Sequence, residues 1–340
     1  MVFSAKCFNS SFVLMSMLTS LGVVLVLLSG GLLGVWVGLE CGFLGVLVIL
    51  AGKSSEENEA CMKYFVFQSI GSAILFISFV MLETGSSLLN PWMLLFWGMA
   101  LKLGLFPFYF WVPSVMGLCS YLSCFIISVW QKISPLWFIS GCGLGGYLSV
   151  GVCLIVCLTG ILGGVGGLGC LHFRTLLGYS SLIQTSWMVL VSLVSSVGVM
   201  FYLFVYSLVL GGLMSNLYSL KVYTYLDFAK GGSFKSSAGL FSVLIDFISL
   251  AGIPPFLGSV PKILGILMCW EFFPVPVSVL VFCSMLSLYY YLSVSMAAGL
   301  GLGVTISFLK FENPGVPFYS VLGYFTFFSI FLLMMLGLGN

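Results

Sequence analysis

Charged residues are scarce in this sequence, and their scarcity excludes most classes of soluble protein. Only 6% of the 340 residues are charged and 61% are hydrophobic, whereas soluble domains usually carry about 25% charged residues. No polar stretch is long enough to form a separate soluble domain. The composition therefore predicts one polytopic membrane domain that covers residues 1–340.

Histidine and paired cysteines are also scarce, which argues against a metal or redox centre. His172 is the only histidine, and none of the eleven cysteines makes a CxxC pair. Two matches to GxGxxG begin at Gly141 and Gly164, but they lie at or beside predicted membrane spans, where they indicate close helix packing and not nucleotide binding. We therefore expect no metal and no redox cofactor in this chain. The net charge of +2 does not suggest nucleic acid as a partner.

Long apolar runs fill most of the chain and predict an all-α membrane helix bundle of about eleven spans. The spans lie near residues 11–29, 31–51, 61–82, 91–112, 115–140, 146–168, 171–194, 197–220, 239–269, 275–298 and 318–338. The ninth is long because glycines and prolines interrupt it.

The positions of lysine and arginine support this count. With eleven spans, the side that holds the amino terminus receives eight of the eleven basic residues, and the other side receives none. This asymmetry places the amino terminus on the positive-inside face and the carboxyl terminus on the opposite face. The eight residues are Lys6, Lys53, Lys63, Arg174, Lys221, Lys230, Lys235 and Lys310.

One predicted span combines a lysine with helix-breaking residues. In residues 97–113, WGMALKLGLFPFYFWVP, Lys102 is followed by Gly104 and Pro107. A charge in the middle of a membrane helix costs at least about 2.5–3.5 kcal/mol, and proline removes a backbone donor. Broken helices with a central ionisable residue are typical of ion pathways in transporters. The alternative is a lysine that reaches toward the membrane surface beside a proline kink.

A second interrupted span lies far along the chain. Lys262 follows Pro254 and Pro255 in the stretch SLAGIPPFLGSVPKILGI, so this lysine comes after its break, whereas Lys102 precedes its own. Two interrupted helices in well-separated parts of one chain suggest an internal repeat, as in the inverted repeats of transporters.

Three further ionisable residues fall inside predicted spans. They are Glu40, Lys132 and Asp246. Asp246 fits two roles, a relay carboxylate or a hydrogen-bonded polar residue that lines the bundle, and the second is favoured. One glutamate and three lysines, without a metal or phosphate motif, suit protons better than larger substrates. Desolvation disfavours the charged form of a lysine and a nearby carboxylate favours it, so moving the carboxylate would load and release a proton.

The chain resembles the NADH dehydrogenase subunit 2 family, the mitochondrially encoded antiporter-like subunits of respiratory complex I. Seven stretches carry the resemblance between residues 30 and 295, in the order expected for that family. They are WVGLE with Glu40, KYFVFQSIGSAIL from Lys63, LKLGLFPFYFWVP with Lys102, WQKISP with Lys132, LLGYSSLIQTSWM around Tyr179, LAGIPPFLGSVPKI with Lys262, and LSLYYYLS near Tyr290.

The resemblance implies a fold and a set of roles. It implies the short animal form with eleven spans and an antiporter-like inverted repeat. It also implies a proton-transfer axis in which Glu40 pairs with Lys102, Lys132 acts as the connector, and Lys262 has the terminal role toward the intermembrane side. Tyr109, Ser114, Thr175 and Gln184 depart from residues that are common in the family, which puts any proton input through those positions in doubt.

The resemblance implies partners and a location as well. We expect a subunit of H⁺-translocating NADH:ubiquinone reductase in the mitochondrial inner membrane, with its amino terminus in the matrix and its carboxyl terminus in the intermembrane space. NAD, FMN, iron–sulfur clusters and ubiquinone would belong to other subunits, and neighbouring antiporter-like subunits and lipids would be the partners. The alternatives are a free-standing cation/proton antiporter and a purely structural membrane spacer.

The one-sided distribution of basic residues generates a topological prediction. The loop 221–238 should face the matrix and Glu271 the intermembrane space, because basic loops stay on the positive-inside face. Protease treatment of right-side-out mitoplasts measures this directly. Cleavage within 221–238 before the membrane is permeabilised would contradict eleven spans.

Overall fold

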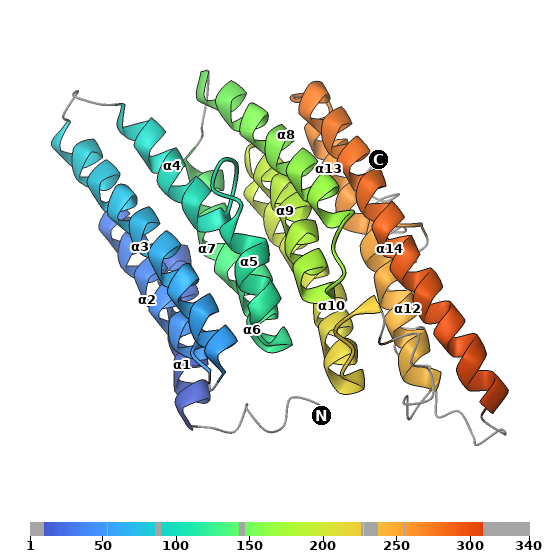
Figure 1. Ribbon diagram of the computed structural model, residues 1–340. Helices are drawn as coiled ribbons and strands as arrows, with labels where there is room; N and C mark the ends of the chain where they lie inside the picture. Colours follow the sequence, from blue (N-terminus) through green and yellow to red (C-terminus); the bar gives the residue numbers. More distant parts are fainter. Residues whose placement is uncertain are drawn as a thin grey trace.

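The computed structural model describes residues 10–52, 54–85, 90–142, 147–225, 227, 237–254 and 256–308. Within these residues the chain is helical apart from short links and one isolated antiparallel bridge between His172 and Thr224. The long helices lie side by side, and successive ones run in opposite directions (Figure 1). The predicted all-α class is confirmed.

The first half of the bundle contains three long helices followed by shorter segments. In chain order these are α1 (Ser10–Leu28), α2 (Leu32–Leu50), α3 (Ser55–Thr84), α4 (Pro91–Leu103), α5 (Trp111–Leu118), α6 (Tyr121–Phe125), the π-helix η1 (Ile126–Trp130) and α7 (Gln131–Gly141). The last three form one continuous helical segment.

The second half contains α8 (Tyr147–Gly167), α9 (Phe173–Ser192), α10 (Ser196–Leu220), α12 (Ser237–Ala251), α13 (Ser259–Cys269) and α14 (Pro274–Phe308). A seven-residue link, 252–258, separates α12 from α13 within the ninth predicted span.

The helices of the described residues correspond to the first ten predicted spans, and the eleventh, 318–338, lies outside them. Six of these helical segments are long and apolar enough to cross a membrane by themselves. The spans that begin at α4 and α12 are broken into shorter helices, as expected from their glycines and prolines.

The boundary between the fourth and fifth spans was predicted incorrectly. We expected the fifth span over 115–140, but residues 111–118 form α5, which follows the break of the fourth span, and the next helix begins at Tyr121. Cys119 and Ser120 adopt extended backbone angles between them. Apolar residues continue across this link, so hydropathy gave no sign of it.

Side chains at the helix starts explain two of the boundaries. The Ser54 side chain accepts a hydrogen bond from the Glu57 backbone N–H at the start of α3. The Asn90 side chain accepts one from the Trp92 N–H, and Pro91 occupies the first helical position of α4. Such caps pair donors that the first helical turn leaves free.

Within each half, helices that are close in the sequence pack against each other. Helix α1 packs on α2, and α3 packs on α4 and α5; in the second half α8 packs on α9, and α10 packs on α12 and α13. Each half contains five spans, an odd number, so a second half with the same order of helices would cross the membrane in the opposite direction. The predicted antiporter-like inverted repeat requires such an odd number.

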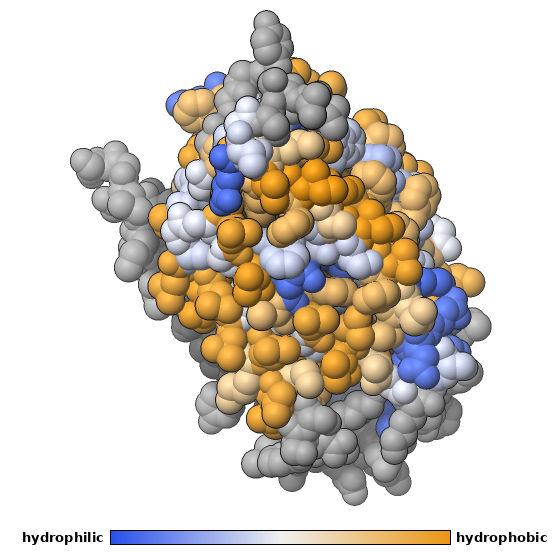
Figure 2. Space-filling model, turned by 90° about the vertical axis from the view of Figure 1, so that its left-hand side faces the viewer, coloured by the Kyte–Doolittle hydropathy of each residue, from blue (hydrophilic) through white to orange (hydrophobic). Residues whose placement is uncertain are grey.

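Many large apolar side chains on the outside of the bundle are exposed. Leu14, Leu28, Val197 and Phe282 are examples, and each is more than half exposed. Apolar side chains dominate the face formed by the amino-terminal helices (Figure 2). Such a surface would be a liability in water, whereas lipid covers it and the helices satisfy their own backbone groups.

The link between α12 and α13 fits only because Gly258 has no side chain. A Cβ atom at this position would lie 1.7 Å from the backbone oxygen of Ser249, so Gly258→Ala must move the backbone. We expect a loss of more than about 3 kcal/mol, above the usual cost of overpacking. Heating membranes and following the remaining folded protein on a native gel measures the change.

Gly151 provides the matched control, because an added Cβ there meets nothing within 4 Å. Gly151→Ala should change stability by no more than about 0.5 kcal/mol. Equal behaviour of the two variants would show that the 252–258 link adapts freely.

Candidate functional site

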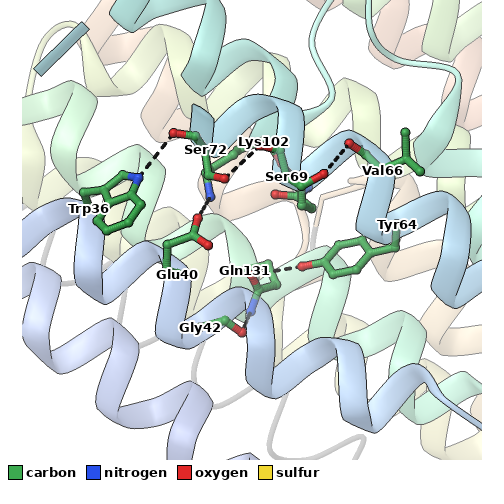
Figure 3. Close-up of polar contacts among 10 residues, drawn as sticks. Trp36, Glu40, Gly42, Tyr64, Val66, Ser69, Ser72, Lys102 and Gln131 are labelled. Atoms are coloured by element: carbon green, nitrogen blue, oxygen red, sulfur yellow. Dashed lines mark hydrogen bonds and ion pairs between the residues drawn. The ribbon is translucent and has the colours of Figure 1, made fainter. Parts of the chain in front are cut away.

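The centre of the site is an ion pair between α2 and α4. Lys102 Nζ lies 3.5 Å from Glu40 Oε1, and the lysine side chain is only 4% exposed. Figure 3 shows the two side chains pointing toward each other between their helices. The structure thus brings together the two residues that the sequence analysis paired. Removing one partner of a buried pair typically costs about 3–5 kcal/mol, since the other charge stays buried.

The break in the fourth span determines where Lys102 sits. Gly104 adopts a left-handed conformation (φ 73°) that ends α4 two residues after the lysine. Side chains bond the backbone oxygens at the break: Gln68 Nε2 donates to the Lys102 oxygen at 3.3 Å, and Trp111 Nε1 donates to the Leu101 oxygen at 3.1 Å. These bonds meet the requirement that irregular backbone at membrane depth be satisfied by protein.

The helix that bears Lys132 is tied to α2 by the preceding residue, Gln131. Its Nε2 donates to the Gly42 oxygen at 3.1 Å, and its Oε1 accepts from the Tyr64 hydroxyl at 3.2 Å (Figure 3). Gly42 lies two residues beyond Glu40, so this contact fixes the end of η1 and the start of α7 near the ion pair.

Lys132 itself contacts a different helix, α9. Lys132 Nζ donates to the backbone oxygen of Ser181 in α9 at 3.0 Å, and the residue is buried. It is the second residue after the π-helix η1, and Pro135 lies inside α7. π-Turns occur frequently at functional sites because they change the register of the side chains that follow.

Lys262 lies in the first turn of α13 and donates to the last residue of α12. The distance from Lys262 Nζ to the Ala251 oxygen is 2.7 Å. Gly252, with φ 83°, provides the space, because a Cβ there would lie 2.8 Å from Nζ. Pro254 lies in the link, as predicted, and Pro255 is outside the described residues.

Lys102 and Lys262 both lie near the carboxyl end of a helix, although Lys102 precedes its break in the chain and Lys262 follows its own. Lys102 is in the last turn of α4, and Lys262 reaches the last carbonyl of α12. Both cations therefore lie at the carboxyl end of a helix, where the helix dipole favours positive charge. A break inside a span creates such an end at membrane depth, so each break provides a favourable position for a buried lysine.

The structure does not gather the four predicted residues into one cluster. Glu40 forms an ion pair with Lys102, while Lys132 and Lys262 each donate to a backbone oxygen. The three lysines are spread along the bundle, on α4, α7 and α13. The arrangement is a series of buried sites, which suits stepwise transfer better than binding of one large substrate.

The residues that depart from the family pattern make local contacts. The Ser114 and Thr175 hydroxyls donate to backbone oxygens three residues earlier, and the Tyr109 ring lies against that of Phe110. Gln184 is different: its Oε1 accepts from the buried Tyr202 hydroxyl at 2.6 Å.

Sequence reasoning did not identify Gln68, Gln131 or Trp111 as parts of the site. A usable signal existed for the two glutamines, since a long polar side chain inside an apolar run needs a partner. No comparable signal existed for Trp111, because tryptophan near a membrane span is usually an interface anchor.

Comparison with known proteins decides the family. The family model described as "NADH:quinone oxidoreductase/Mrp antiporter, TM" matches residues 29–287. NADH-ubiquinone oxidoreductase chain 2 of Mytilus edulis is 37% identical over 256 residues, which are 74% of this chain and 77% of that one. The chain belongs to the NADH-ubiquinone oxidoreductase chain 2 family. The resemblance noted from the sequence is confirmed.

Other members and a solved structure agree with this assignment. NADH-ubiquinone oxidoreductase chain 2 of Locusta migratoria is 31% identical over 249 residues, 71% of each chain. A chain of respiratory complex I from Thermus thermophilus superposes with a TM-score of 0.71 at 21% identity, covering 91% of this chain and 73% of that one. The match to the bacterial chain shows that the two share a fold.

The indole of Trp111 generates a prediction about the broken helix. Trp111→Phe keeps an aromatic ring but removes the donor to the Leu101 oxygen, next to Lys102. The Leu101 oxygen then keeps its bond from the Gly104 backbone N–H, and the loss of one hydrogen bond costs about 0.5–1.5 kcal/mol. We expect thermal stability to fall by that amount and proton translocation to fall with it, because the end of α4 loses its anchor.

The exposed Trp92 of α4 is the control, and Trp92→Phe should leave both measurements nearly unchanged. Wild-type stability and translocation in Trp111→Phe would show that the indole N–H does not hold the break.

Proposed function

We propose that the chain is a core membrane subunit of proton-pumping NADH:ubiquinone oxidoreductase and carries protons through Glu40, Lys102, Lys132 and Lys262. The buried ion pair between Glu40 and Lys102, at a broken helix, is the observation that supports this most strongly. Its two members are held by different helices, so their separation can change when the helices move.

The electrostatics of the pair suit a loading step. Two opposite unit charges about 4 Å apart attract each other by roughly 4 kcal/mol at an effective dielectric constant near 20. Moving Glu40 away would remove much of this attraction while Lys102 stays desolvated, and the neutral amine would then be favoured. A small displacement of α2 against α4 is thus converted into the release of a proton.

Lys132 and Lys262 are placed to receive and pass the proton. Each donates to a backbone oxygen, a weaker partner than a carboxylate, so neither charge is held as strongly as that of Lys102. In this proposal Lys132 connects the two halves of the bundle, and Lys262 delivers protons toward the intermembrane space. Gln131 keeps the connector in register with the helix of Glu40.

The same proposal assigns the redox chemistry to other proteins. NAD, FMN, iron–sulfur clusters and ubiquinone would be bound by other subunits of the complex, while this chain forms one membrane domain over residues 1–340. We place it in the mitochondrial inner membrane, with the amino terminus in the matrix, next to other antiporter-like subunits and lipids. The chain 2 relatives favour this assignment over a free-standing cation/proton antiporter.

A double-mutant cycle on the ion pair tests the proposal. In the assembled complex, Lys102→Ala and Glu40→Gln should each reduce proton translocation by about tenfold or more, equivalent to about 1.36 kcal/mol or more. The double variant should be less impaired than the two losses combined, because contacting partners couple by about 0.5–3 kcal/mol. NADH oxidation and proton uptake into liposomes are measured for all three.

Native gels provide the control for assembly. Each variant should migrate together with NADH dehydrogenase activity, as the unmodified chain does in this proposal. Strictly additive losses, or normal coupled turnover in Lys102→Ala, would remove the pair from the mechanism. Migration of the unmodified chain as a small isolated species would instead favour the free-standing antiporter.

A further inference from the structure

The ammonium of Lys102 has a second neighbour besides Glu40, the aromatic ring of Phe43. Lys102 Nζ lies 5.9 Å from the centre of this ring, within the roughly 6 Å over which an aromatic face attracts a cation. Phe43 follows Glu40 by three residues on α2, so the carboxylate and the ring lie on the same side of that helix. Helix α2 thus presents two different groups to the lysine.

The contact with Glu40 alone is a poor match for a buried ammonium. A lysine ammonium has three N–H donors, and its distance of 3.5 Å from Glu40 Oε1 exceeds the roughly 2.7–2.9 Å of a strong charge-assisted hydrogen bond. The lysine side chain is 4% exposed, so bulk water contributes little. A charge removed from water needs close partners to offset its desolvation. The face of the Phe43 ring is a further group that the structure places beside it.

Neighbouring helices hold Phe43 in place. The residue is 3% exposed, and the centre of its ring lies 5.8 Å from that of Tyr64 in α3. The Tyr64 hydroxyl donates to Gln131 Oε1, and Gln131 Nε2 donates to the oxygen of Gly42, the residue before Phe43 (Figure 3). Contacts from α3 and from the start of α7 therefore fix both the ring and the backbone next to it.

The carboxylate of Glu40 is held by fewer contacts. Its side chain is 21% exposed, and among the described residues Lys102 is its only hydrogen-bond or ion-pair partner. A rotation of the Glu40 side chain would therefore lengthen the ion pair without breaking another polar contact. The lysine lies between a charge that can move and an aromatic face that is fixed.

We propose that Phe43 is a positioning residue that holds the protonated Lys102 while Glu40 moves away. This inference rests on the proposed loading of Lys102 and adds a requirement to it. When the carboxylate is displaced, the ring still attracts the ammonium, so the lysine keeps its place at the end of α4 until its proton is transferred. An aliphatic side chain would fill a similar space but would offer the cation no such attraction.

Phe43→Leu tests this proposal because it removes the ring and keeps an apolar side chain. In the assembled complex, reconstituted into liposomes, we expect the protons translocated per NADH oxidised to fall about threefold or more. Phe43→Tyr keeps the aromatic face and should remain within about twofold of the unmodified complex. Normal translocation in Phe43→Leu, or an equal loss in Phe43→Tyr, would overturn the proposal.

Phe79→Leu is the matched control for lost packing. Phe79 of α3 is also fully buried, but its ring packs against Phe138, at 5.6 Å between ring centres. This variant should lose thermal stability, as expected when a large core side chain is shortened, and should translocate protons normally. Equal losses of translocation in Phe79→Leu and Phe43→Leu would show a general packing defect and would also overturn the proposal.

A further variant covers the case in which Phe43→Leu does not assemble. Phe43→Met lacks the aromatic face as well, but its flexible side chain fills irregular gaps in a core. Assembly on native gels with reduced translocation supports the proposal, and assembly with normal translocation overturns it. Loss of assembly in both variants would show that the ring serves folding and would overturn it too.

Lys102→Ala in the same preparation separates this inference from the proposed function. A defect in Lys102→Ala together with normal Phe43→Leu rejects only the role of Phe43. Normal translocation in Lys102→Ala rejects the proton-carrying role of Lys102 itself.

Discussion

A helix that breaks inside a membrane must find partners for its own backbone, and much of this structure follows from that requirement. At the first break, the Lys102 and Leu101 oxygens receive donors from Gln68 and Trp111. At the second, the Ala251 oxygen receives the ammonium of Lys262. In lipid no water is present to donate hydrogen bonds to these oxygens. Lys102 and Lys262 therefore lie where the backbone is irregular, and the residues that stabilise the first break also surround Lys102.

Composition and the lengths of the apolar runs were sufficient to predict the order of most helices, because an apolar run of membrane length rarely forms anything except a membrane helix. The breaks were equally visible, since glycine and proline signal them directly. The start of α5 and the link at residues 119–120 were not visible, because apolar residues continue through both. Hydropathy reports the medium around a segment and not its backbone angles.

The charged residues of the site could be named from the sequence, but their partners could not. A buried lysine implies a cost, yet nothing in the local sequence states that Glu40 faces Lys102 while Lys132 turns to the Ser181 oxygen. These contacts join residues 62 and 49 positions apart, and they depend on the packing of whole helices. The resemblance to a known family supplied the pairing of Glu40 with Lys102, and the structure supplied the distances.

The π-helix before Lys132 changes the directions in which side chains point along one membrane span. A π-turn accommodates one residue more than an α-turn, and one residue corresponds to about 100° of rotation around the axis. Tyr121, before it, can therefore bond the Val222 oxygen beyond α10 while Lys132, after it, contacts α9. A single helical wheel drawn through 121–141 would misplace one of these residues. The extra residue fixes the rotation of the second part of the span relative to the first. One helical segment can therefore contact the Val222 loop through Tyr121 and α9 through Lys132.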